Sequence, residues 1–172
     1  MNNSIVKRAI YKILDLCYTK LEKRFYTRNS YLNLIPSLSS RKGGTRTLTE
    51  WGYTIGLFGT LIHQNLLKEE KRKMLDVGCG TGRLAIAVSP FLKENDTYTG
   101  IEVMKFDYEY CKRTYVGGKY NFILLDANNP SYARQNEESQ KDWPLPDNEF
   151  DIVTALSVWT HFSEADARFY LK

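Results

Sequence analysis

A short strand that turns through three glycines into a helix constrains this chain more than any other feature. Residues 74–77 (Met-Leu-Asp-Val) form an apolar run, and the turn 78–82 (Gly-Cys-Gly-Thr-Gly) leads into the helical pattern of 83–93. Such a turn lets the main chain approach a ligand closely, with the N–H groups of the helix pointed at it. The segment therefore predicts a nucleotide-type binding site at the carboxyl end of a strand.

Strand and helix patterns alternate from residue 73 onward. Strands that alternate with helices are typical of a parallel sheet built from right-handed crossovers. We therefore predict an α/β fold, a Rossmann-like three-layer αβα sandwich with a mainly parallel sheet. The expected strands are residues 74–77, 98–103, 121–125 and 152–158, and the expected helices are 83–93, 104–115 and one that begins at 163.

Two nucleotide-type ligands fit the glycine turn. Gly80, Gly82 and Ala85 satisfy the dinucleotide pattern G-x-G-x-x-G/A, which would make the protein an NAD(P)-dependent oxidoreductase. Asp76 lies two residues before the first glycine, where its negative charge would oppose a pyrophosphate. A ligand with cationic groups suits that position better, and S-adenosylmethionine carries both an ammonium and a sulfonium.

The acid and the glycines resemble the first motif of class I S-adenosylmethionine-dependent methyltransferases, an acid followed by G-x-G-x-G. Glu102 ends the second expected strand, where the acid of that family binds the ribose hydroxyls, and Asp126 ends the third, where the family contacts adenine. The resemblance covers about residues 73–172. The cofactor-binding residues that it implies are Asp76, Gly78, Cys79, Gly80, Gly82, Glu102, Asp126, Ala127 and Ser157.

The end of the fourth expected strand resembles the small-molecule branch of this family. Residues 143–151 are similar to its proline-containing lead-in, and residues 157–162 to the strand end beside the transferred methyl. The resemblance implies methyl transfer to a small-molecule acceptor, on oxygen in preference to nitrogen, with no metal. A hydroxyl acceptor needs a base within hydrogen-bond reach, and His161 is our candidate for that catalytic role.

The first half of the chain has a different pattern, so we predict an N-terminal helical extension or lid over residues 1–72 and a cofactor-binding core over 73–172. Residues 4–26 read as a basic amphipathic helix, which we expect to pack its apolar stripe on the domain. Residues 36–47 read as a mobile basic loop. A second helix begins at Thr47, where Thr47 and Glu50 have capping-box spacing. Three glycines lie on one of its faces, Gly52, Gly56 and Gly59. Close approach by another backbone or a ligand would explain them, although packing of the helix on the sheet is the interpretation that we favour.

Charge is unevenly divided along the 172 residues. Residues 1–73 contain 14 Lys and Arg against 5 Asp and Glu, and residues 74–172 contain 10 against 15. A basic half can bind nucleic acid or an anionic surface, although a solvated helical surface is the interpretation that we favour. Three widely spaced cysteines and the lack of a long apolar segment favour a reducing, cytoplasmic location and predict no transmembrane segment.

The family sheet usually has seven strands, whereas four are visible in this sequence. The fourth strand would then be an apolar sheet edge, which is a pairing hazard. We expect either that the chain is a piece of a longer protein or that a partner covers this edge, and we expect little turnover from residues 1–172 alone. A truncated, non-catalytic cofactor-binding or interaction module is therefore a further alternative to the enzyme. The oligomeric state stays open.

Overall fold

A computed structural model of the chain describes residues 6–16, 30–41, 46–66, 71–125 and 141–171. Residues 6–16 are helical. The elements that follow, with η for a 3-10 helix, are η1 (Ser30–Leu34), η2 (Leu38–Ser40), α2 (Leu48–Asn65), β1 (Lys73–Val77), α3 (Arg83–Val88), β2 (Thr97–Glu102), α4 (Lys105–Thr114), β3 (Tyr120–Leu124), β4 (Ile152–Ala155), η3 (Trp159–His161) and α5 (Glu164–Tyr170).

The strands form one parallel sheet in the order β3-β2-β1-β4, which confirms the predicted α/β fold. Strand β1 lies between β2 and β4, and Asp76 in β1 is level with Gly100 in β2 and Thr154 in β4. The carboxyl ends of these three strands therefore meet at one edge of the sheet, where α/β proteins of this kind bind ligands.

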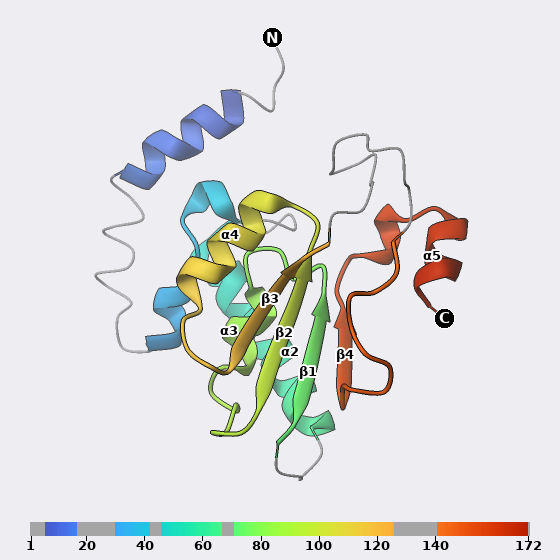
Figure 1. Ribbon diagram of the computed structural model, residues 1–172. Coiled ribbons are helices and arrows are strands. Elements are labelled where there is room, and N and C mark those ends of the chain that lie inside the picture. The colour runs from blue at the N-terminus through green and yellow to red at the C-terminus, as the bar shows by residue number, and fades with distance from the viewer. Residues whose placement is uncertain (1–5, 17–29, 42–45, 67–70, 126–140, 172) are drawn as a thin grey trace.

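Two apolar clusters cover the two faces of the sheet. The larger cluster packs α2, α3 and α4 against one face, and it includes Trp51, Ile86 and Tyr98. The smaller cluster packs residues 143–150, η3 and α5 against the other face. Figure 1 shows this three-layer arrangement, with α3 and α4 to the left of the sheet and α5 to its right.

Two elements end earlier than the sequence pattern predicts. Helix α3 stops at Val88 rather than at residue 93, because Pro90 has no N–H for the helical ladder and its ring would crowd the preceding turn. Strand β4 stops at Ala155 rather than at residue 158, because Ser157 has a left-handed backbone (φ +58°) and a 3-10 turn follows. The other predicted strands and α4 agree with the structure to within one residue at each end.

Helix α2 begins as predicted, with a capping box. The Thr47 hydroxyl accepts the N–H of Glu50, and the Glu50 carboxylate accepts the N–H of Thr47. Of the three glycines, Gly59 alone shows the close approach of another backbone that we considered for this row. A Cβ there would lie 3.1 Å from the carbonyl oxygen of Ala87 in α3, whereas a Cβ at Gly52 or Gly56 would meet open space.

The prediction of a mobile basic loop over residues 36–47 is wrong for its first half. Pro36 is buried, and the Arg41 side chain is only 1% exposed. The Arg41 guanidinium donates to the carbonyl oxygens of Pro36, at 3.0 Å, and Arg46, at 2.7 Å. A buried cation needs hydrogen-bond acceptors, and these two backbone carbonyls supply them. The Arg41 side chain therefore holds the segment in a fixed conformation and is not hydrated by solvent.

The expected packing of the first helix on the domain is also not observed over residues 6–16. Its apolar residues are exposed, with Ile10 at 49% and Ile13 at 67%. Figure 1 shows this helix, in blue, standing apart from the layers around the sheet. No helix among the described residues is long and apolar enough to cross a bilayer.

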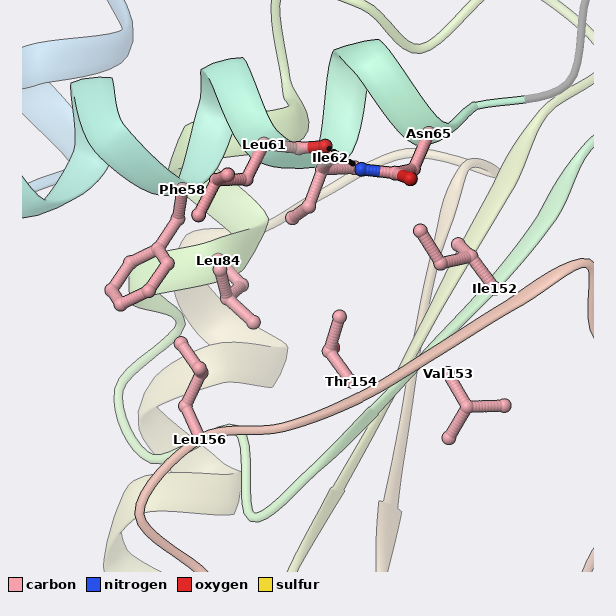
Figure 2. A pocket seen from close by; sticks show the side chains of 9 residues that line it. All are labelled: Phe58, Leu61, Ile62, Asn65, Leu84, Ile152, Val153, Thr154 and Leu156. Carbon is pink, nitrogen blue, oxygen red and sulfur yellow. Dashed lines mark hydrogen bonds between the residues drawn. The ribbon is translucent and has the colours of Figure 1, made fainter.

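Within the part of the chain that the structure describes, β4 is an edge strand, as predicted from the sequence. An apolar groove of about 230 Å³ runs between this strand and α2 (Figure 2). Ile152, Thr154 and Leu156 form one of its walls, and Phe58 and Ile62 form the other. The groove lies on the α2 side of the sheet edge, and its lining does not include the glycine turn.

Replacing glycines in α2 tests the close packing against α3. We expect Gly56→Ala to raise the free energy of unfolding by about 1 kcal/mol, because alanine favours a helix and the new methyl meets open space. Gly59→Ala should give no such gain, because its methyl would crowd the carbonyl of Ala87. Urea denaturation of both variants measures the difference. An equal gain from both would contradict the packing.

Candidate functional site

The glycine turn joins β1 to α3 through three left-handed residues. Gly78, Gly80 and Gly82 have φ values of +69°, +54° and +84°, a region that side chains disfavour. Two of them also leave no space for a Cβ. One at Gly78 would lie 2.6 Å from Val158, and one at Gly82 would lie 2.5 Å from the Tyr115 ring. The turn therefore requires glycine for both conformation and packing.

Glu102 ties this turn to the end of β2. One carboxylate oxygen accepts the N–H of Gly80 at 2.7 Å, and the other accepts the N–H groups of Val103 and Met104. Burial raises the pKa of Glu102, and the nearby charge of Asp107 raises it further, while the backbone hydrogen bonds lower it. The structure thus brings together the predicted acid and the predicted glycines, from two different strands.

Asp76 lies in the interior beneath the turn and is 3% exposed. Its carboxylate accepts hydrogen bonds from the hydroxyls of Tyr98 and Thr154, on the two neighbouring strands. Burial raises the pKa of Asp76 from 3.8 to about 7, and the charge of Glu102 adds to the rise, whereas the two hydroxyls lower it. Tyr98 and Thr154 carry no sequence signal of their own, because their roles follow from the strand register.

Helix α4 holds the turn from the side. The Tyr115 hydroxyl contacts the carbonyl oxygens of Thr81 and Gly82, at 3.1 and 2.8 Å, and the Cys111 thiol contacts that of Gly80 at 3.2 Å. The Cys79 thiol is buried, and the neighbouring Cys111 together with burial raises its pKa. Cys79 therefore contributes its main chain to the turn, while its side chain belongs to the core.

The segment before α2 also reaches the turn. The Thr81 hydroxyl donates to the carbonyl oxygen of Ser40 at 3.2 Å, and the Tyr110 hydroxyl donates to that of Leu34 at 3.4 Å. The Arg83 guanidinium lies over the Trp51 ring, 4.5 Å from its centre. Sequence reasoning missed these contacts, because no local pattern links residues 34–41 to a turn forty positions later.

The end of β4 lies against the same turn, through Val158 and Gly78. Ser157 is exposed and left-handed, and His161 is exposed at the end of η3. The Trp159 and Phe162 rings pack edge to face with centres 5.4 Å apart, within the smaller apolar cluster. Asp126 and Ala127 lie outside the described residues.

A parallel α/β sheet with a glycine turn after its central strand and an acid after the next strand defines a Rossmann-like nucleotide-binding fold. Residues 74–172 match the model of a methyltransferase domain family, so the chain belongs to that family. This confirms the class predicted from the motifs, and S-adenosylmethionine is the family's cofactor. The dinucleotide interpretation of the turn is set aside.

Several solved structures are similar to this chain. The YcgJ protein from Bacillus subtilis is 23% identical over 63% of this chain and 40% of its own, with a TM-score of 0.44. Coclaurine N-methyltransferase, solved with N-methylheliamine and SAH, is 19% identical over 60% of this chain and 32% of its own, with a TM-score of 0.36. The 16S rRNA methylase ArmA is 19% identical over 66% of this chain and 53% of its own, with a TM-score of 0.34. The chain thus spans about half or less of their lengths.

The buried Asp76 makes stability depend on pH. Its pKa is raised on folding from 3.8 to about 7, so the folded state holds its proton more tightly than the unfolded state does. Stability from this group is therefore fully present below pH 4 and is lost as pH rises to 7. The loss is on the order of 4 kcal/mol, at about 1.4 kcal/mol per pKa unit.

Asp76→Asn should remove this pH-dependent part of the free energy of unfolding, whereas Asp147→Asn, at an exposed position, should retain it. Urea unfolding of the parent chain and both variants, measured from pH 4 to pH 8, tests the assignment. Parallel profiles for the parent chain and Asp76→Asn would contradict it.

Proposed function

We propose that this chain binds S-adenosylmethionine at the carboxyl edge of its sheet and transfers the methyl group to an oxygen of a small-molecule acceptor. The observation that carries the proposal is the contact between Glu102 and the N–H of Gly80. It joins the acid and the glycine turn into one site within a methyltransferase domain.

The residues of this edge fit the cofactor. The Glu102 carboxylate has about four lone-pair sites, and backbone N–H groups occupy three of them, so Oε2 retains acceptor capacity for one ribose hydroxyl. A Cβ at Gly80 would meet open space, so the main chain there is approachable. Asp76 places a buried carboxylate in the strand before the turn, and a cationic ligand suits that charge better than a pyrophosphate does. We also assign cofactor-binding roles to Gly78, Cys79 and Gly82 in the turn and to Ser157. Asp126 and Ala127 are assigned to the cofactor site from the sequence resemblance.

S-adenosylmethionine, when bound, supplies a methyl carbon already activated by a sulfonium. The protein then has to hold the acceptor at attacking distance and exclude water, and these tasks need no metal. In the proposed domain division, the core over 73–172 holds the cofactor and residues 1–72 cover it. Support for the cover comes from the Thr81 contact to Ser40 and the Tyr110 contact to Leu34.

The choice of acceptor rests on the end of β4. Residues 156–159 read Leu-Ser-Val-Trp and lack the Asn/Asp-Pro-Pro-aromatic motif that methyltransferases acting on base amino groups carry, which disfavours that substrate class. His161 is exposed on the 3-10 turn that follows, at the end of the strand beside the glycine turn. We propose it as the base that takes the proton from that hydroxyl.

Calorimetric titration with S-adenosylmethionine and S-adenosylhomocysteine tests the cofactor site, with NAD as the comparator. We expect saturable binding of both adenosyl ligands. Glu102→Ala should weaken it about ten- to a hundredfold, because hydrogen bonds to a charged group contribute about 1.5–3 kcal/mol. Glu102→Gln, which keeps an acceptor for Gly80, should weaken it less, and the exposed control Glu94→Ala should not weaken it. Preference for NAD, or equal affinity in Glu102→Ala, would refute the site.

Replacing His161 tests the proposed base. With the intact protein and an acceptor found by screening, we expect His161→Gln to lower kcat about a hundredfold or more and to leave the affinity for S-adenosylmethionine unchanged. His63→Gln is the matched control, because that histidine lies in α2, where its ring stacks on that of Phe91 with centres 4.6 Å apart. An unchanged kcat in His161→Gln would exclude the role. Methylation of nitrogen or of RNA would refute the proposed acceptor.

A further inference from the structure

The helix over residues 6–16 is attached to the domain by its polar side. Tyr11 and Asp15 are its half-buried residues. The Asp15 carboxylate accepts the backbone N–H groups of Leu38 and Ser39, the second at 3.0 Å, and the Arg46 guanidinium lies over the Tyr11 ring, 5.2 Å from its centre. These contacts fix which way the helix faces.

The opposite side of this helix is apolar and faces away from the domain. At about 100° per residue, Tyr11 and Asp15 point in nearly the same direction, and the apolar residues centre on the reverse direction. Their exposures range from 38% to 69%. They are Val6, Ile10, Ile13, Leu14 and Leu16.

Lys7 and Lys12 lie at the two borders of the apolar side, whereas Arg8 lies on the attached side, about 20° from Asp15 at about 100° per residue. Lys7, Arg8 and Lys12 are exposed, and Asp15, the one acid of residues 6–16, is engaged by the backbone of η2. The outward surface of the helix thus combines an apolar stripe with cations and no carboxylate. An amphipathic helix with this distribution binds in the plane of an anionic membrane surface, apolar side down.

We propose that residues 6–16 form a membrane-binding helix that docks the protein on anionic lipid. Charge complementarity selects this occupant. Lys7 and Lys12 would contact lipid headgroups while the apolar stripe enters the headgroup–acyl boundary. A nucleic acid would engage the same cations but would leave Ile10 and Ile13 in water. The inference goes beyond methyl transfer and does not depend on it.

This attachment also relates the docked surface to the candidate cofactor site. Asp15 binds the N–H groups of Leu38 and Ser39, and the next residue, Ser40, accepts the hydroxyl of Thr81 in the glycine turn. One short run of backbone therefore connects the helix to the turn.

Vesicle flotation tests the proposal. The probes are vesicles of phosphatidylcholine alone and vesicles of phosphatidylcholine with one third phosphatidylserine. We expect the chain to float with the anionic vesicles and to partition at least about tenfold less onto the neutral ones, with binding that weakens as salt rises. Equal partitioning onto both vesicles, or no flotation with either, would overturn it.

Matched variants separate the two components of binding. Ile10→Glu with Ile13→Glu should lower partitioning onto anionic vesicles at least about tenfold, whereas Val116→Glu, at an exposed site 78% accessible, should not change it. Lys7→Glu with Lys12→Glu should also lower it, and the exposed control Lys105→Glu should not.

Two further readouts keep the proposal falsifiable. All four variants should bind S-adenosylmethionine as the parent chain does, so a failure here is distinct from a failure of the cofactor site. Binding to single-stranded RNA that competes fully with the anionic vesicles and is insensitive to Ile10→Glu with Ile13→Glu would overturn the proposal in favour of nucleic acid. A concentration-dependent dimer abolished by that double substitution, without flotation, would overturn it in favour of a second copy of the chain.

Discussion

The ligand-binding edge depends on the hydrogen bonds that the Glu102 carboxylate accepts. A parallel sheet brings strand ends together but does not shape the loops that leave them. Here one buried side chain accepts the N–H groups of Gly80, Val103 and Met104, which belong to the loops after two adjacent strands. Buried donors need acceptors, so the conformations of both loops are set by the same two oxygen atoms.

A second buried carboxylate supports the sheet below that point. Asp76 links β1 to β2 through Tyr98 and to β4 through Thr154. Both partners are neutral hydroxyls, so the burial of the charge is only partly offset and the pKa of Asp76 stays high. The two acids therefore do different work. Glu102 orders loops near the ligand, and Asp76 cross-links the strands that carry them.

The sequence allowed the sheet, the glycine turn, the capping box at Thr47 and the acid at Glu102 to be predicted, because each is encoded by nearby residues or by strand order. The burial of Arg41 could not be predicted, since its acceptors at Pro36 and Arg46 are supplied by a backbone shape that no periodicity reveals. Helix periodicity located the apolar stripe at Ile10 and Ile13 but not its direction. The direction depends on Asp15 meeting Leu38, a contact between distant segments.

The thiols beneath the glycine turn have a consequence for how its motion could be followed. Cys79 and Cys111 are buried, and the Cys111 thiol contacts the carbonyl oxygen of Gly80. A water-soluble alkylating reagent reaches such sulfur atoms only when the turn and α4 separate. Once Cys17 has been replaced, the rate at which these two cysteines are alkylated, measured by mass spectrometry, reports the rate at which the turn opens, with no engineered label.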